Sequence, residues 1–157
     1  MESTHLAHLY ALDPILPACT RLVVDPSSHV ALLLYVDAEV PLCVLHAVRL
    51  TPSASDLLLA LLQAYPDHCP YRTLFAALYP MDPWDRQLAT RPIRRAVVTL
   101  SRALQHLGLA VIALRRRGYV LTNNHAVSIE PLIRLRVSQW IAAQITEGSP
   151  KKEQNHG

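Results

Sequence analysis

The chain has 157 residues, of which 51% are hydrophobic and 17% are charged. This is enough apolar material for the core of one domain with short appendages, and it excludes disorder over most of the chain. The longest unbroken apolar run, Val30 to Val36, is too short to cross a bilayer, so we expect no membrane contact.

The start of the chain and its cysteines indicate a cytoplasmic protein. The first twenty residues contain His5, His8, Asp13 and two prolines, and they lack the basic start and apolar centre of a secretion signal. The three cysteines are widely spaced and odd in number, which favours reduced thiols over a disulfide framework.

The formal net charge of +3 is distributed unevenly along the chain. Residues 1–85 hold nine acids and three bases, whereas residues 86–117 hold eight arginines and no acid. A solvated surface usually mixes its signs, so this acid-free block predicts an anionic partner. All eight bases are Arg rather than Lys, which favours planar, bidentate contact with phosphate groups or guanine edges.

The first fifty residues predict a small antiparallel sheet after a lead-in. Residues 1–19 form a loosely specified lead-in segment. Apolar and β-branched runs at 20–24, 29–36 and 41–50 predict three strands, and an aspartate-proline turn separates the first two.

The pattern changes to helical spacing at Thr51. Thr51 and Pro52 are typical of an N-cap followed by proline at the first helical position, and a leucine-rich run follows. Residues 71–79 predict a short second helix. Two prolines three residues apart then predict a loop at 80–85.

A third helix is expected over residues 90–106, with Thr90 as its cap and Pro92 in its first turn. Ile93, Val97, Leu100 and Leu104 form an apolar stripe for burial. The other side of this helix carries Arg91, Arg94, Arg95, Val98, Thr99 and Arg102. Gly108 is expected to end the helix.

The C-terminal part predicts a hairpin and one more helix. Apolar runs at 109–114 and 118–122 flank the triplet Arg115, Arg116 and Arg117, which would lie at a hairpin tip. A helix over 128–146 carries an apolar face, which docks on the protein's own sheet or forms a dimer contact. Residues 147–157 are expected to be a disordered tail. The apolar face consists of Ile129, Ile133, Val137, Trp140 and Ile141.

Four segments of the chain together resemble a known family, the OmpR/PhoB-type winged helix-turn-helix DNA-binding domain of many bacterial response regulators. The segments are LVVDPSSHVALL (22–33), LTPSASDLLLALLQAYPD (50–67), DRQLATRPIRRAVVTLSRAL (85–104) and LRRRGYVL (114–121). The resemblance covers residues 20–122 and implies an α+β winged-helix fold with an N-terminal antiparallel sheet, a three-helix core, and a C-terminal hairpin wing. The predicted helix at 128–146 is an addition to that fold, and the receiver domain that often precedes this module is not expected.

The chain departs from the family pattern at positions that matter for DNA. The family usually has a basic pair just before Leu100, where this chain has Val98 and Thr99; its Arg94-Arg95 pair lies one turn earlier. Wing positions that are commonly glycine and a small residue are Arg116 and Arg117 here. Arg115, Gly118 and Tyr119 match the wing, and we expect Tyr119 to pack the wing onto the body.

The resemblance implies a transcriptional regulator that binds double-stranded DNA. The helix at 90–106 would enter the major groove, and the wing at 112–121 would contact the backbone or the minor groove. The residues expected to contact DNA are Arg91, Arg94, Arg95, Val98, Thr99, Arg102, Arg115, Arg116 and Arg117. In the family the loop at 80–86 contacts RNA polymerase, whereas the alternative role for Trp84 is to cap the core.

Three other interpretations of the arginines stay open. In the first, Arg94, Arg95 and Arg102 pair with the acidic first half of the chain. In the second, the triplet Arg115, Arg116 and Arg117 is a solvated turn without a binding role. Alternatively, the protein is a winged-helix interaction module whose basic face binds an acidic protein.

The residues offer little for catalysis, so we expect no enzymatic activity, no cofactor and no metal. Cys43 and His46 are three apart on a predicted strand and so point to opposite faces. His68 and Cys69 stand alone in a turn, without zinc-ligand spacing. Four glycines in the whole chain provide no glycine-rich phosphate loop. A redox switch at Cys69 is a weaker alternative.

Overall fold

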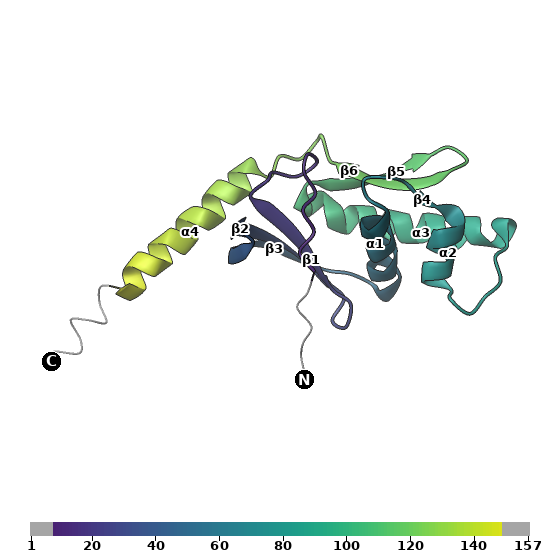
Figure 1. Cartoon of the computed structure of the whole chain (residues 1–157), viewed down its shortest axis with the longest axis horizontal. Coiled ribbons are helices and arrows are strands. Elements are labelled where there is room, and N and C mark those ends of the chain that lie inside the picture. The colour runs from purple at the N-terminus through teal and green to yellow at the C-terminus, as the bar shows by residue number, and fades with distance from the viewer. Residues whose placement is uncertain (1–7, 149–157) are drawn as a thin grey trace.

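Figure 1 shows the computed structural model, which describes residues 8–148. These residues have a mixed α+β architecture with four α-helices and two three-stranded antiparallel sheets. The α+β class expected from the sequence is therefore confirmed. No helix among them is long and apolar enough to cross a membrane.

The first sheet consists of β1 (Thr20–Asp25), β2 (Val30–Asp37) and β3 (Val40–Arg49), in that order. The three predicted strands are confirmed, and their ends differ from the prediction by one residue at most. In the β1–β2 turn, the Asp25 carboxylate accepts hydrogen bonds from the Ser27 amide at 3.0 Å and from the Ser27 and Ser28 hydroxyls at 2.7 and 2.8 Å. These bonds lower the pKa of Asp25 to about 2.

The segment before β1 is better ordered than its sequence predicts. Tyr10 and Leu22 exchange two backbone hydrogen bonds of 2.9 Å, so Tyr10 forms an antiparallel bridge to β1. The side chains of Leu12 and Leu16 are each 2% exposed and belong to the main core. The expectation of a loosely specified lead-in is therefore wrong for this stretch, because two leucines are enough to anchor it.

The first two helices follow their local signals. In α1 (Pro52–Ala64) the Thr51 hydroxyl accepts a hydrogen bond from the Ala54 amide at 3.1 Å, as expected of an N-cap. After β4 (Cys69–Pro70), α2 spans Tyr71–Leu78. Both predicted helices are confirmed.

The third helix begins earlier than predicted. α3 spans Arg86–Leu104, and its N-cap is Asp85, whose carboxylate accepts hydrogen bonds from the amides of Gln87 and Leu88. The predicted cap, Thr90, lies inside the helix and donates to the Arg86 carbonyl. Pro92 is also interior, so it leaves the Leu88 carbonyl without its usual helical donor. The short helix η1 (Gln105–Leu107) follows, and Gly108 ends it with φ 75°, in the left-handed region as predicted.

The second sheet has the order β4-β6-β5, where β5 is Leu109–Leu114 and β6 is Gly118–Asn123. The hairpin was predicted, and its two strands pair in register from Leu109 with Asn123 to Leu114 with Gly118. β4 was not predicted. It contributes two residues, which pair with the first two residues of β6.

The last helix, α4, spans Glu130–Gly148 and packs against β3. The Ser128 hydroxyl accepts a hydrogen bond from the Glu130 amide at 3.4 Å, in keeping with its predicted role at the start of the helix. The predicted tail at 147–157 begins too early, since Glu147 and Gly148 belong to α4; the rest of it lies outside the described residues.

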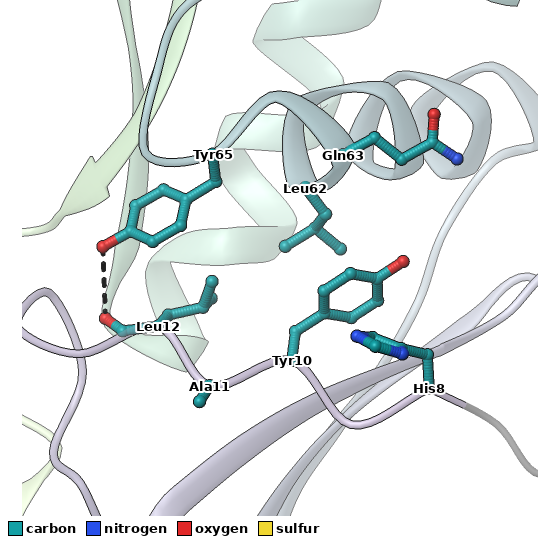
Figure 2. Close-up of a pocket in the computed structure, with 7 residues that line it drawn as sticks. All are labelled: His8, Tyr10, Ala11, Leu12, Leu62, Gln63 and Tyr65. Atoms are coloured by element: carbon teal, nitrogen blue, oxygen red, sulfur yellow. Dashed lines mark hydrogen bonds between the residues drawn. The ribbon is translucent and has the colours of Figure 1, made fainter.

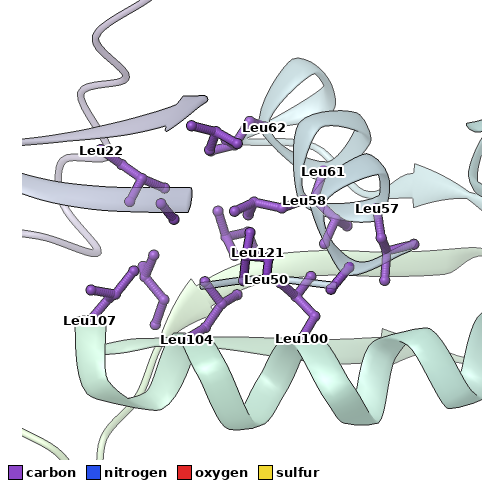
Figure 3. Packing of buried hydrophobic residues seen from close by; sticks show 14 of the residues in the cluster. Leu22, Leu50, Leu57, Leu58, Leu61, Leu62, Leu100, Leu104, Leu107 and Leu121 are labelled. Atoms are coloured by element: carbon purple, nitrogen blue, oxygen red, sulfur yellow. The ribbon is translucent and has the colours of Figure 1, made fainter. Parts of the chain in front are cut away.

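The main core is built largely from leucines of α1, α3, β1 and β6 (Figure 3). The predicted stripe of α3 is buried in it, with all four residues at most 8% exposed. Burial of this stripe fixes the rotation of α3 about its axis. The side of the helix that carries its arginines must therefore face outward.

Candidate nucleic-acid interface

The outward side of α3 is an arc of positive charge. At about 100° of rotation per residue, Arg91, Arg94, Arg95, Val98 and Arg102 fall within an arc of roughly 100°, opposite the buried stripe. All five side chains are exposed, and Val98 is 47% exposed. The helix has 19 residues and is therefore about 28 Å long, enough to present three turns of this face to a partner.

Thr99, the remaining predicted contact on α3, is less available. Its side chain is half-buried, and its hydroxyl donates a hydrogen bond to the Arg95 carbonyl at 3.2 Å. Such back-bonding to the preceding turn occupies the donor of the hydroxyl. Thr99 therefore lies at the edge of the arginine arc, and its hydroxyl oxygen can still accept a hydrogen bond but cannot donate one to a partner.

The hairpin tip carries the other three predicted residues. Arg115, Arg116 and Arg117 are exposed and form the turn between β5 and β6, which is closed by a hydrogen bond of 2.9 Å from the Arg117 amide to the Leu114 carbonyl. Arg116 has φ 64°. This left-handed conformation costs a residue with a Cβ roughly 1–2 kcal/mol. Glycine, which has no Cβ, adopts this conformation without that cost.

Tyr119 joins the hairpin to α3. Its ring is half-buried against the core and lies edge-on to Tyr71 of α2, with 5.8 Å between the ring centroids. Burial and the neighbouring Tyr71 raise the pKa of the Tyr119 hydroxyl, and the Arg94 guanidinium opposes this rise. Arg94 is therefore close to the base of the hairpin. The prediction that Tyr119 packs the hairpin onto the body is confirmed.

Gly118, next to Tyr119, allows two backbones to approach. A Cβ built on Gly118 would lie 1.9 Å from the Cys69 carbonyl oxygen, and its φ is 155°. The sequence analysis did not find this reason for the glycine, nor the supporting role of Tyr71. Both depend on β4, whose two residues carry no strand pattern.

The comparisons come to one finding. No family model, curated protein or solved structure matches this chain. The argument for a function therefore depends on the residues of the chain itself.

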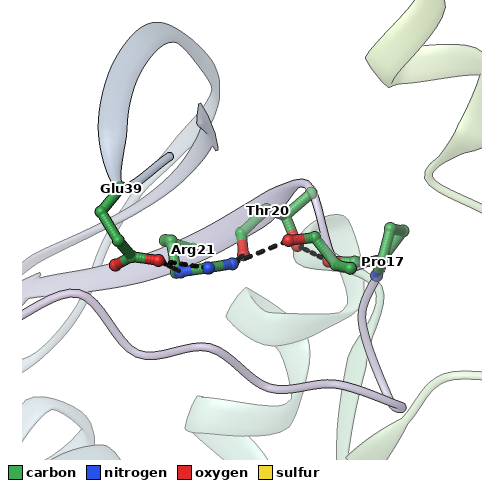
Figure 4. Close-up of polar contacts among 5 residues, drawn as sticks. Pro17, Thr20, Arg21 and Glu39 are labelled. Carbon is green, nitrogen blue, oxygen red and sulfur yellow. Dashed lines mark hydrogen bonds and ion pairs between the residues drawn. The ribbon is translucent and has the colours of Figure 1, made fainter. Parts of the chain in front are cut away.

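Among residues 8–148, no acidic residue forms an ion pair with the outward arginines of α3 or with those of the hairpin tip. Within residues 8–148 the sole ion pair joins Arg21 of β1 to Glu39 in the β2–β3 turn (Figure 4), and the Arg21 Nε–Glu39 Oε1 distance is 2.9 Å. The interpretation in which Arg94, Arg95 and Arg102 pair with the acidic half is thus not realised among these residues. We define the arginine face as the exposed arginines on the outward arc of α3 together with those of the hairpin tip: Arg91, Arg94, Arg95, Arg102, Arg115, Arg116 and Arg117.

The loop before α3 has a packed side and an open side. Trp84 lies edge-on to Phe75 of α2 with 5.6 Å between centroids, and the Arg72 guanidinium lies 5.9 Å from the Trp84 ring centroid. Trp84 is thereby part of the core boundary, as its capping role predicts. Met81 and Leu88 remain 92% and 69% exposed.

The buried thiol of Cys69 does not favour a redox switch at this position. Cys69 is fully buried, and burial raises its pKa to about 11, which leaves little thiolate at neutral pH. No group of three or more His, Cys, Asp or Glu residues in the described part of the chain is arranged to hold a metal ion.

A groove of about 550 Å³ lies between the lead-in and the end of α1 (Figure 2). His8, Tyr10 and Tyr65 are among its lining residues, and none of them comes from α3 or the hairpin. It has no charged lining residue apart from the titratable His8. The groove is therefore separate from the arginine face.

Proposed function

We propose that this chain is a winged helix-turn-helix protein that binds double-stranded DNA and regulates transcription. In this proposal α2 and α3 form the helix-turn-helix, α3 is the recognition helix, and the β5–β6 hairpin is the wing. The observation that carries the proposal is the arginine face, whose arginines on α3 and at the hairpin tip are all exposed and have no acidic partner among the described residues.

The geometry of α3 suits the major groove. That groove is about 12 Å wide and admits an α-helix, whose outward side chains then reach the base edges. Arg94 and Arg95 offer planar donors for guanine, and Val98 offers an apolar contact for a thymine methyl group. Their exposure and the buried opposite stripe support this orientation of α3.

The hairpin tip suits the phosphate backbone or a narrow minor groove. Arginine is drawn to a narrow minor groove by its enhanced negative potential. An arginine at the left-handed position 116 lowers the stability of the free protein, and strain of this kind is concentrated at functional sites. The cost of keeping Arg116 supports a role in binding.

We expect the substitution Arg116→Gly to have opposite effects on stability and binding. Glycine adopts φ 64° without a Cβ penalty, so the free energy of unfolding should rise by about 1 kcal/mol. Loss of one phosphate contact should weaken duplex binding roughly fivefold at physiological salt. Thermal unfolding and fluorescence anisotropy measure the two effects. Equal duplex affinity of the two proteins would remove Arg116 from the binding surface.

The direct test of the function is duplex binding across a salt series. Purified protein is titrated into labelled random-sequence and genomic duplex fragments, and binding is followed by fluorescence anisotropy. If about five phosphates are neutralised, log affinity should fall against log salt with a slope near −4.5. A subset of tightly bound fragments would identify the operator. Absence of binding at low salt would reject DNA and favour an acidic protein as the partner of the same face.

The exposed apolar side chains of Met81, in the loop before α3, and of Leu88, in the first turn of α3, form a second contact surface in this proposal. The family resemblance implies RNA polymerase as its partner, and Met81 and Leu88 are the apolar groups available to it. Substituting both by glutamate should abolish co-purification with RNA polymerase and leave duplex affinity unchanged. Retained co-purification would assign Met81 and Leu88 no role in that contact.

A further inference from the structure

Helix α4 has an inner face that is fully accounted for by the fold. Ile129, just before the helix, and Ile133 are buried at 7% and 8% exposure, and Val137 packs against the same core. The Arg136 Nε donates a hydrogen bond of 3.2 Å to the Leu45 carbonyl of β3. β3 is an edge strand, so this contact covers part of its free edge. Docking on the sheet, one of the two predicted roles of the apolar face, is therefore realised for Ile129, Ile133 and Val137, whereas Ile141, which was predicted to share that face, is 47% exposed.

The same helix has a second apolar face that no described residue covers. We call it the outer face, and it consists of Leu135, Ser138, Ile141, Ala142 and Ile145. All five residues are exposed; the three large side chains are 51%, 47% and 65% exposed, in chain order. Their spacing of three and four residues places them on one side of the helix over three turns. Figure 1 shows α4 extending away from the rest of the molecule.

An apolar stripe on this side of α4 is exposed to water, which is unfavourable in free energy unless a partner covers it. A helix that packs on one side normally carries polar residues on the other, and one that is apolar on both sides is normally buried on both. Isoleucine is also a weaker helix former than alanine, so helix propensity does not explain Ile141 and Ile145. Every residue from Ile141 to Glu147 is exposed, so this half of α4 has no burial in the protomer.

We propose that the outer face of α4 pairs with the outer face of a second copy of this chain in an antiparallel arrangement. In an antiparallel pair of copies, the charges at the two ends of α4 are complementary, which favours this direction over the parallel one. Arg134 borders the outer face near the start of α4 and is exposed. In a parallel pair the two Arg134 side chains would face each other. In an antiparallel pair each lies beside the last turn of the partner helix, where the carbonyl ends carry negative partial charge.

The antiparallel register also matches the sizes of the side chains. It sets Leu135 opposite Ile145 at both ends of the contact and Ser138 opposite Ala142 near the twofold axis. Near the axis Ile141 lies between the small residues Ser138 and Ala142, which leave room for its side chain, and the pairs of Leu135 with Ile145 close the two ends. A stripe of three turns buries less than the roughly 800 Å² per partner of a standard interface. The dimer should therefore dissociate in the micromolar range.

The proposal is independent of DNA binding and is tested on the full chain alone. Sedimentation equilibrium over a concentration series should show a monomer–dimer equilibrium. Ile141→Glu with Ile145→Glu should weaken dimerisation by at least about tenfold, without lowering the melting temperature measured at monomeric concentration. The matched control is Ile112→Glu, because Ile112 of β5 is 47% exposed like Ile141 and lies elsewhere. A monomer at every concentration, or equal dimerisation of the double variant and the control, would overturn the proposal.

Direction is tested by disulfide trapping in a background with Cys19 and Cys43 replaced by serine. A chain with Leu135→Cys and a chain with Ile145→Cys are each oxidised alone. A mixture of the two chains is then oxidised under the same conditions. Positions ten residues apart on a helix are separated by about 15 Å, which exceeds disulfide reach. The mixture should cross-link and each chain alone should not. Cross-linking of the Leu135→Cys chain with itself would show parallel pairing and reject the arrangement proposed here.

Discussion

Removing five charges from the arginine face should abolish most duplex binding. The variant carries alanine at Arg94, Arg95, Arg115, Arg116 and Arg117. Each lost phosphate contact lowers affinity roughly fivefold at physiological salt, so the five together should lower it by about three orders of magnitude. The slope of log affinity against log salt should move from near −4.5 towards zero, because fewer counterions are released. Fluorescence anisotropy with one duplex at several salt concentrations measures both quantities.

A control that removes one arginine outside the arginine face tests whether loss of charge elsewhere on the protein lowers the affinity. Arg49 is exposed at the end of β3 and lies outside the acid-free block. Arg49→Ala should leave the affinity and the slope close to those of the unaltered protein. If the variant with five substitutions keeps the affinity and the salt slope of the unaltered protein, the arginine face is not the duplex-binding surface. Both variants alter exposed side chains, so their melting temperatures should stay near that of the unaltered protein.

The helix and the hairpin should contribute differently to this loss. Arginine contacts to guanine discriminate between bases by roughly 1–3 kcal/mol each, whereas phosphate contacts act on all sequences alike. Alanine at Arg94 and Arg95 should therefore reduce the preference for the selected fragments over random duplex. Alanine at the three hairpin positions should weaken both fragment classes by the same factor.

Local signals in the sequence located most of the elements. Thr51 and Pro52 fixed the start of α1, and apolar alternation fixed β1, β2 and β3 to within a residue. The outward residues of α3 were also predictable, because the buried stripe alone sets the rotation of the helix. For the arginine face, the residue types and the helical period were sufficient.

The elements that were missed depend on contacts distant in sequence. Pro92 indicated the first turn of a helix, yet Asp85 caps α3 seven residues earlier and the core holds Pro92 inside it. β4 exists because β6 lies beside it. Leu12 and Leu16 pack into the main core, but the sequence pattern around them does not indicate which elements they would contact. The outer face of α4 was not predicted, because Ile141 was assigned to the same apolar face as Ile133 and Val137.

The largest expected loss of stability comes from Gly118→Ala. The new Cβ would lie 1.9 Å from the Cys69 carbonyl oxygen and 2.9 Å from the Pro70 Cα, so it meets backbone that cannot move like a side-chain tip. The φ of 155° adds strain for any residue with a Cβ. We expect the free energy of unfolding to fall by about 3 kcal/mol or more, which lowers the melting temperature by roughly 10 °C. Thermal unfolding followed by circular dichroism measures this.

Gly108→Ala provides the comparison, because Gly108 also has positive φ, at 75°. A Cβ built on Gly108 would lie 2.6 Å from the Ile129 Cγ2 atom, which belongs to a side chain rather than to the backbone, so the loss should be smaller. A melting temperature for Gly118→Ala at or above that of Gly108→Ala would contradict the role of β4 as the brace of the hairpin. If the brace fails, Tyr119 loses its fixed place beside Tyr71 and Arg94. The hairpin arginines then lose their alignment with α3, so Gly118→Ala should weaken duplex binding even at temperatures where the protein remains folded.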